Sequence, residues 1–272
     1  MEQIMKWIRE RRSVRTFDGA ALPEASIQKI QTFLSQIENP YEIPVTFQLL
    51  DAARQGLRSP VITGTDCFLG AKVPRVPHAE EAFGYSMELL VLYAQSLGLG
   101  TTWIGGTMDR AAFEKAMKLD AETEMMLCVT PLGRPAAKMS LRETMMRKGV
   151  KADSRLDDAQ LFFSGGFDTP LSPAEAGKLR TPLEAVRLAP SAVNKQPWRL
   201  VVTQNAVHFY EAHTKGFISE ANGDMQKIDM GIALCHFALA AEAESLRLSF
   251  SLEAPDLPTP ENTEYIATFQ LI

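Results

Sequence analysis

Two prolines enclose the stretch of the chain whose side chains are best suited to hold a ligand. Pro190 and Pro197 bracket six residues, among which the uncharged hydrogen-bonding groups belong to Ser191, Asn194 and Gln196. Proline fixes φ and removes a backbone donor, so this segment is predicted to be a loop. Neutral donors and acceptors can match the alternating carbonyls and ring nitrogens of a heterocycle one to one. A polar turn between a helix and a strand would explain the same residues without a ligand.

A second candidate site lies at the end of the first expected helix. Its arginines and hydroxyl are Arg11, Arg12, Ser13 and Arg15. Guanidinium groups pair with phosphate oxygens in a bidentate manner and the serine adds a donor, so the cluster fits a phosphate group. Arg147 and Lys148 would add positive charge to it. The alternatives are a solvated helix end for the first cluster and a basic linker for the second.

A third candidate is the run Trp103-Ile104-Gly105-Gly106. The tryptophan offers an apolar surface, and glycine lets backbone N–H groups approach a ligand closely. Core packing is the alternative explanation for Trp103.

The periodicity of apolar residues predicts helices and strands that would position these three segments. Helices are expected at 2–12, 23–37, 78–97, 109–119, 173–188 and 225–246, with the fifth divided in two by Pro182. Strands are expected at 45–50, 67–70, 125–130, 198–203, 207–210, 248–252 and 265–271. The segment 140–151 is basic and rich in methionine, and the segment up to residue 158 is predicted to be a connector.

The two halves of the chain repeat each other. A helix, a strand and a long apolar helix recur in the same order, with an offset of 149 at the helix ends (245 minus 96) and 152 across the loops (191 minus 39). We therefore expect two repeats, 1–152 and 153–272, that form an intramolecular pseudo-dimer. The repeats are unequal, because the arginine cluster occurs only in the first and the proline loop only in the second.

Composition excludes several functional classes. The 272 residues carry a net charge of -5, and no block of like charges suggests nucleic-acid binding. The three cysteines are far apart in apolar settings, which predicts reduced thiols in a cytoplasmic protein. The histidines show no metal-ligand spacing, and no apolar run has the length of a signal peptide or a membrane span.

The three motifs together resemble the FMN-dependent nitroreductase family. Arg11-Arg12-Ser13-Val14-Arg15 is similar to its N-terminal phosphate motif, 189–198 to its proline–serine–asparagine–glutamine–proline–tryptophan loop, and 97–106 to the segment beside its flavin ring. In the usual single-domain pattern the proline loop follows soon after the arginines, whereas here it lies in the second repeat. The chain therefore resembles a branch in which two degenerate domains are fused.

The resemblance implies an α+β fold, a three-layer α/β/α sandwich, with one FMN between the repeats of each chain. Arg11, Arg12, Ser13 and Arg15 would hold the FMN phosphate with Arg147 or Lys148, and Pro190, Ser191 and Ala192 would cover the ring. Asn194 and Gln196 would bond the ring or brace the loop, while Ile104, Gly105 and Gly106, next to Trp103, would offer backbone donors. NAD(P)H would reduce the flavin, which would then reduce a nitroaromatic, a quinone or a similar acceptor; the resemblance assigns no acid or base among the side chains.

Other functions of the same fold stay open at this point. One is a flavin-binding or flavin-less protein without reductase activity, and another is a different FMN reaction, such as dehalogenation or flavin fragmentation. A helical interaction module is disfavoured by the number of expected strands. A fused pseudo-dimer is compatible with a monomeric protein, and the sequence does not specify the acceptor or the choice between NADH and NADPH.

Overall fold

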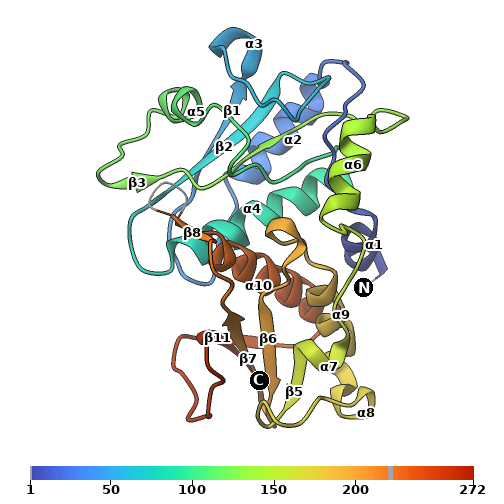
Figure 1. Ribbon diagram of the computed structural model, residues 1–272, viewed down its shortest axis with the longest axis vertical. Coiled ribbons are helices and arrows are strands. Elements are labelled where there is room, and N and C mark those ends of the chain that lie inside the picture. The colour runs from blue at the N-terminus through green and yellow to red at the C-terminus, as the bar shows by residue number, and fades with distance from the viewer. Residues whose placement is uncertain (1, 220–222) are drawn as a thin grey trace.

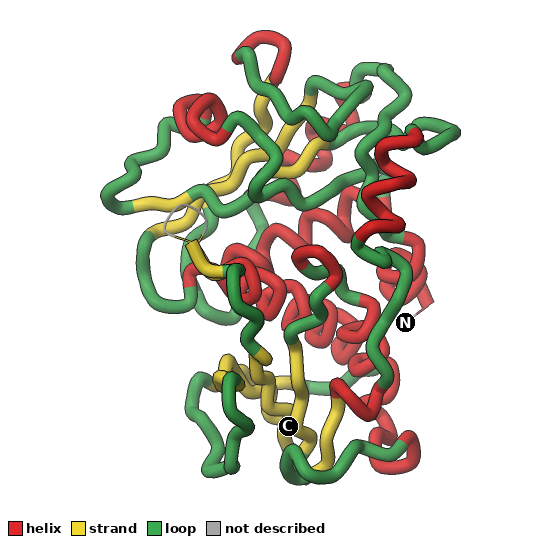
Figure 2. Tube along the Cα trace, in the orientation of Figure 1, coloured by secondary structure: helices red, strands yellow, loops and turns green. Residues whose placement is uncertain are grey.

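The computed structural model describes residues 2–219 and 223–272. The described residues form two larger, mostly antiparallel sheets with long helices between them, as Figure 1 and Figure 2 show, and a small sheet of two short strands, β8 (Ile218–Ser219) and β9 (Gly223–Asp224). The first sheet and its helices come from the first half of the chain: α1 (Glu2–Glu10), α2 (Glu24–Leu34), β1 (Thr46–Asp51), α3 (Ala52–Gln55), β2 (Cys67–Pro74), α4 (Ala79–Ser96), α5 (Arg110–Ala116), β3 (Glu124–Met125), β4 (Val129–Pro131) and α6 (Leu141–Gly149).

The second half contributes the other sheet. Its elements are α7 (Asp158–Leu161), β5 (Phe162–Ser164), α8 (Pro173–Ala176), the 3-10 turn η1 (Gly177–Leu179), α9 (Arg180–Leu188), the 3-10 turn η2 (Ala192–Asn194), β6 (Trp198–Val202), β7 (Ala206–Ala212), β8 (Ile218–Ser219), β9 (Gly223–Asp224), α10 (Met225–Ala243), β10 (Leu248–Ser251) and β11 (Thr263–Leu271).

The sheets differ in how helices cover them. The first has the order β1-β2-β3, with β4 also paired to β2, and the second has the order β10-β11-β7-β6-β5. One face of the first sheet packs toward α4 through Leu69, and its other face packs against α5, where Phe68 meets Phe113 edge to face. The second sheet packs toward α10 through Phe209, which meets Phe237 edge to face. On its other face Phe167 packs against Tyr210.

One continuous hydrophobic core joins the halves, because α4 and α10 lie against each other between the sheets (Figure 1). Both helices are apolar around most of their circumference, as expected for helices buried on all sides. The contact is closest at two glycines. A Cβ placed on Gly84 would lie 2.1 Å from the carbonyl oxygen of Ile228, and a Cβ on Gly231 would lie 2.1 Å from that of Glu81.

These two contacts are related by a single offset. Gly231 follows Gly84 by 147 residues (231 minus 84), and Ile228 follows Glu81 by the same number (228 minus 81). A reciprocal pair of contacts of this kind is the signature of a twofold interface. The chain therefore contains an internal pseudo-twofold axis at the crossing of α4 and α10, and the predicted repeat is confirmed.

The offset of 149 predicted for the ends of these helices is wrong by two residues. Both helices end on a residue in the left-handed region, Gly98 with φ of 73° and Ser245 with φ of 61°. The next residue donates its N–H to a carbonyl five residues back in each helix, Leu99 to Ala94 at 2.9 Å and Leu246 to Ala241 at 2.9 Å. Gly98 thus corresponds to Ser245, which restores the offset of 147 (245 minus 98). The offset of 149 came from pairing Ser96 with Ser245 because both residues are serines.

Most predicted elements are present with boundaries shifted by a few residues, and three differ more. The segment 173–188 is divided at Gly177, which has φ of 49°, and not at Pro182. Pro182 lies in the first turn of α9, where backbone N–H groups have no partner in the helix. The strand expected at 125–130 is split into β3 and β4.

The third difference is α6, in a segment whose helix was not predicted. Ser140 is its N-cap and accepts a hydrogen bond from the N–H of Glu143 at 3.1 Å. The spacing of serine and glutamate in Ser140-Leu141-Arg142-Glu143 is typical of a helix start and was the signal available in the sequence.

We predict that Gly84→Ala and Gly231→Ala each destabilise the protein, although alanine favours helix formation. The added methyl group must displace a backbone carbonyl of the other helix, and overpacking of this kind costs about 1–3 kcal/mol. For a chain of this size the melting temperature should fall by at least about 2 °C in calorimetry. Gly149→Ala is the matched control, because a Cβ there meets open space. Equal melting temperatures for all three variants would contradict the close helix contact.

Candidate functional site

A cavity of about 310 Å³ opens where the two halves meet. Its size is typical of small-molecule sites. The walls come from the end of α1, the segment after Thr101, α6 with the connector that follows it, the proline loop, and the N-terminal half of α10. The cavity is therefore built by both repeats.

The structure brings most of the predicted site residues together around this cavity. Those that line it are Arg11, Arg12, Ser13, Arg15, Trp103, Gly105, Gly106, Arg147, Pro190, Ser191, Ala192 and Asn194. The exceptions are Ile104, Lys148 and Gln196. Lys148 lines a separate surface hollow beside α6. Ile104 is buried and exchanges backbone hydrogen bonds with Val129, so its N–H is not available to a ligand.

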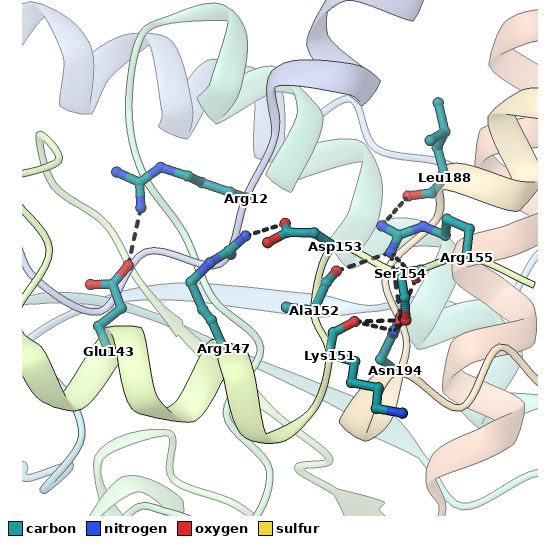
Figure 3. Close-up of polar contacts among 10 residues, drawn as sticks. All are labelled: Arg12, Glu143, Arg147, Lys151, Ala152, Asp153, Ser154, Arg155, Leu188 and Asn194. Carbon is teal, nitrogen blue, oxygen red and sulfur yellow. Dashed lines mark hydrogen bonds and ion pairs between the residues drawn. The ribbon is translucent and has the colours of Figure 1, made fainter.

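Five arginines line one part of the cavity, and carboxylates or backbone carbonyls of the chain hold several of them. Arg12 Nη1 donates to Glu143 Oε1 at 3.0 Å, Arg147 pairs with Asp153, and Arg155 donates to the carbonyl of Leu188 at 3.3 Å (Figure 3). The lining contains Arg11, Arg12, Arg15, Arg147 and Arg155, with Asp153 and Asp229 as its carboxylates. The positive charges outnumber the negative ones, so the cavity favours an anionic ligand.

Several donors of this region have no partner within the described part of the chain. Arg11 Nε, Arg155 Nε and Thr102 Oγ1 are buried without a hydrogen bond. Burial lowers the pKa of Arg11 and of Arg155, and repulsion between neighbouring guanidinium groups lowers both further. Buried donors are normally satisfied, and an anion bound here would satisfy them and relieve the repulsion.

The position of Arg11 depends on a buried carboxylate of α4. Glu88 is fully buried; its Oε1 lies 3.9 Å from Arg11 Nε, and its Oε2 accepts a hydrogen bond from Trp103 Nε1 at 3.2 Å. His236 Nε2 lies 2.9 Å from Glu88 Oε1, and His236 Nδ1 lies 2.9 Å from the carbonyl oxygen of Ala185. Since a carbonyl only accepts, His236 Nδ1 is the donor in its contact with Ala185. The network connects the arginine cluster to both central helices.

The proline loop is held in an irregular conformation by three hydrogen-bonding groups. Ser191 Oγ accepts from the N–H of Gln196 at 2.8 Å, and both carboxylate oxygens of Asp229 lie 3.0 Å from the N–H of Ala192. Asn194 donates to the carbonyl of Lys151 at 2.8 Å. Positive φ angles occur at Val193, Asn194 and Gln196 (43°, 60° and 52°), a conformation that costs energy for residues with a side chain and must be stabilised by the surroundings.

Asn194 and Gln196 therefore brace the loop, which was one of the two roles expected for them. Gln196 is 3% exposed, and its Oε1 accepts from the N–H of Leu156 at 2.9 Å. Asn194 also lines the cavity. Both amides fasten the loop to the connector that follows α6, and Asn194 Oδ1 also lies 3.5 Å from Arg155 Nη1 of that connector.

The region that corresponds to the cavity in the other half is filled by aromatic rings. The offset of 147 relates Met225 and Ile228 of the lining to His78 and Glu81, and Trp103 to Phe250. Tyr41 stacks on His78 with centroids 5.4 Å apart and meets Phe250 edge to face at 4.9 Å. The pseudo-symmetric position is thus packed with side chains.

Several charged residues of the site, Glu88 among them, were not found by sequence reasoning. Arg155 and Asp229 line the cavity, and Glu143 orients Arg12 and accepts the N–H of Arg15 at 3.2 Å. One local signal was the helix-start spacing that includes Glu143. The ionisable Asp229 within a largely apolar helix was a second, because an unpaired carboxylate is rarely buried.

Comparison with known proteins identifies the family. The model of the family described as "Putative TM nitroreductase" matches residues 3–241. The chain belongs to this family. The predicted membership and the α+β nitroreductase-like fold with two repeats are confirmed, whereas the boundary at residue 152 stays a prediction. A search of curated proteins found no match to this nitroreductase-family chain.

One solved structure has the same fold over nearly the whole chain, and others match about half of it. The crystal structure of a "putative nitroreductase" from Thermotoga maritima is 19% identical, with a TM-score of 0.61 over 99% of this chain and 93% of that chain. A structure from Desulfovibrio desulfuricans, described as "a putative nitroreductase in complex with fmn", is 18% identical, with a TM-score of 0.41 over 52% of this chain and 94% of its own. A structure from Bacteroides thetaiotaomicron, described as "Putative NADH dehydrogenase/NAD(P)H nitroreductase", is 20% identical, with a TM-score of 0.42 over 50% of this chain and 89% of its own.

Within the described residues of this nitroreductase-family chain, no helix has the length and apolar character needed to cross a bilayer.

We predict that Asp229 makes the stability of the ligand-free protein fall as pH rises. Burial raises the pKa of Asp229 well above its ordinary value. The folded state then favours the protonated form, so stability decreases as pH rises from about 4, the unfolded pKa, toward the folded pKa. Asp229→Asn stays neutral, keeps an oxygen for Ala192 N–H, and should lose less stability between pH 5 and pH 8, as measured by urea unfolding.

The matched variant Asp229→Leu removes the acceptor of Ala192 N–H and should cost about 1–2 kcal/mol at both pH values. An unfolding free energy of Asp229→Asn that follows pH as steeply as that of the unmodified protein would contradict this role.

Proposed function

We propose that this protein is an FMN-dependent oxidoreductase of nitroreductase type, with one FMN between the two repeats. NAD(P)H would be the electron donor, and a nitroaromatic, a quinone or a similar small molecule the acceptor. The observation that carries the proposal is the cavity in which the arginines of the first half meet the proline loop of the second half.

The arginine part of the cavity suits the phosphate of FMN. This part contains more guanidinium groups than carboxylates. It also contains buried donors that make no hydrogen bond within the described residues. A phosphate dianion pairs with guanidinium groups in bidentate geometry. Ser13 lies in the same lining and offers a hydroxyl or a backbone group. Arg12, held by Glu143, and Arg15 would bind the phosphate with Arg11 and Arg147, and Arg155 would add to this set.

The remainder of the cavity suits a flat heterocycle. Trp103, Ile228 and Ile232 provide apolar surface, and Gly105, Gly106 and Ala192 bring backbone close to the cavity. A Cβ on Gly106 would meet open space, whereas one on Gly105 would lie 3.3 Å from Cys128 Sγ. When bound, FMN would supply the hydride chemistry; the residues around it orient the ring and exclude water.

A single site per chain follows from the unequal repeats. The position related by the offset of 147 holds the rings of Tyr41, His78 and Phe250. The second half of the chain also lacks an arginine cluster of the kind at 11–15. We extend the proposal to a monomeric protein with a repeat boundary at residues 152 and 153, because the interface that a symmetric dimer would need already exists within the chain.

We predict about one FMN per chain and reduction of that flavin by a nicotinamide. Flavin released by denaturation is quantified against protein, and the intact protein is titrated anaerobically with NADH and with NADPH while the visible flavin band is followed. A ratio near two would contradict the single site. A yellow protein that neither nicotinamide bleaches would favour the alternative, a flavin-binding protein without reductase activity.

We predict that Ser191→Trp and Arg12→Glu each weaken FMN binding at least tenfold, although the residues lie in different repeats. The tryptophan would fill the space over the ring, and the glutamate would face both Glu143 and the phosphate. FMN fluorescence titration of the apoprotein measures the affinity. The controls are Ser35→Trp and Arg58→Glu, which place the same bulk and the same charge change at exposed positions. Full FMN affinity in Ser191→Trp would contradict a site shared between the repeats.

A further inference from the structure

A second cluster of polar residues lies in the C-terminal half, outside the lining of the cavity. Glu211 is at the end of β7, His213 follows that strand, and Asp224 is the N-cap of α10. One potential ligand atom from each residue lies within 4.8 Å of the other two. Two carboxylates and an imidazole at this separation are a plausible ligand set for a divalent cation.

The burial of Glu211 distinguishes this cluster from an ordinary surface group of acids. Its side chain is fully buried, and neither carboxylate oxygen accepts a hydrogen bond from the described residues. Its nearest polar neighbour is His213 Nδ1, 2.7 Å from Oε1. Burial of a charged carboxylate without hydrogen bonds costs free energy of folding unless a positive charge lies beside it. Among the described side chains, His213 is the group beside Glu211 that could carry such a charge.

The surroundings of His213 fix which of its nitrogens faces the cluster. Glu264 Oε2 lies 3.1 Å from His213 Nε2, and Lys227 Nζ donates to the other oxygen of Glu264 at 3.0 Å. A carboxylate that accepts the N–H of one imidazole nitrogen leaves the other as a lone-pair donor, which is the usual outer-shell arrangement of metal-binding histidines. Here that other nitrogen is Nδ1, which lies 2.7 Å from Glu211 Oε1.

We propose that Glu211, His213 and Asp224 bind one divalent transition-metal ion, for which Zn²⁺ is the best match. Imidazole together with carboxylates favours Zn²⁺ over Mg²⁺ and Ca²⁺, which prefer oxygen ligands alone. Three protein ligands leave a fourth tetrahedral position for water. Ligand atoms on one zinc ion are about 3.3 Å apart when each bond is about 2.0 Å, so side-chain rotation within the cluster would close the site. This site is absent from the sequence-based expectations, which include no metal.

The ion would have a structural effect on α10. Asp224 caps this helix through the N–H of Gln226 at 2.9 Å, and the next turns carry Ile228 and Asp229 of the cavity wall. A metal shared by Asp224 and Glu211 would fasten the helix start to β7. The proposal does not depend on flavin binding or on reductase activity, because the cation site and the cavity are formed by different side chains.

The test uses the full chain, treated with a chelator and dialysed. Addition of Zn²⁺ should give about one bound zinc per chain by calorimetric titration, and saturating Zn²⁺ should raise the melting temperature by about 5 °C or more. Glu211→Gln and Asp224→Asn should each abolish both effects, whereas Mg²⁺ and Ca²⁺ should give neither. Asparagine is still a good N-cap, so Asp224→Asn should fold.

Asp109→Asn is the matched control, because Asp109 caps α5 in the same way and lies outside the cluster. This variant should keep the full response to Zn²⁺. Absence of zinc binding, or an equal response in Glu211→Gln and the unmodified chain, would overturn the proposal. So would a Glu211→Gln variant that is more stable than the unmodified chain at pH 8 with and without Zn²⁺. That outcome would show Glu211 to be a buried acid whose pKa of about 8 results from burial and nearby carboxylates.

Discussion

The backbone contact between α4 and α10 constrains the rest of the molecule. Gly84 and Gly231 let each helix approach a carbonyl of the other, so the two helices pack at a distance that larger residues would prevent. The two sheets are built outward from this pair, and one core extends from the first sheet to the second. The cavity depends on the same contact, because α10 of the second half forms part of its wall and most of its arginines come from the first half. Any change in the helix crossing would therefore move the arginines relative to the proline loop.

Buried carboxylates fix the positions of the arginines, just as the two glycines fix the distance between the central helices. Glu88 and Glu143 have side chains that are fully buried, and each lies beside one guanidinium group of the cluster. A buried carboxylate needs a positively charged partner, and a guanidinium group among other guanidinium groups needs a negatively charged one. Each carboxylate and its arginine therefore restrict each other's position. These pairs leave some positive charge and some donors unmatched. A site that is assembled before its ligand arrives loses less entropy on binding, and the arginine cluster has this property.

The sequence predicted those parts of the site whose chemistry is local, and it missed those that depend on tertiary packing. The arginine cluster, the proline loop and the Trp103 segment are recognisable because each concentrates its special residue types within a few positions. Arg155 and Asp229 are single residues, and nothing near Asp229 in the chain indicates that its partner is the N–H of Ala192, 37 positions away. Ile104 was misplaced for the same reason, because its pairing with Val129 is a long-range contact. The helix offset was misjudged because a left-handed helix end can be made by glycine or by serine, and residue type alone does not show which positions correspond.

The degeneracy of the repeats has a physical explanation in the pseudo-twofold interface. In a chain that contains both repeats, the two equivalent positions are occupied by different residues, so one half can differ in sequence without altering the other. Around the second position, Tyr41, His78 and Phe250 pack into what would otherwise be an empty cleft, which recovers dispersion and hydrophobic energy that a vacant polar site lacks. The helix crossing cannot change in this way, because its two glycine contacts lie on the axis and support both halves at once. The features near the axis have therefore stayed symmetric, while the features farther from it have diverged into one open cavity and one filled core.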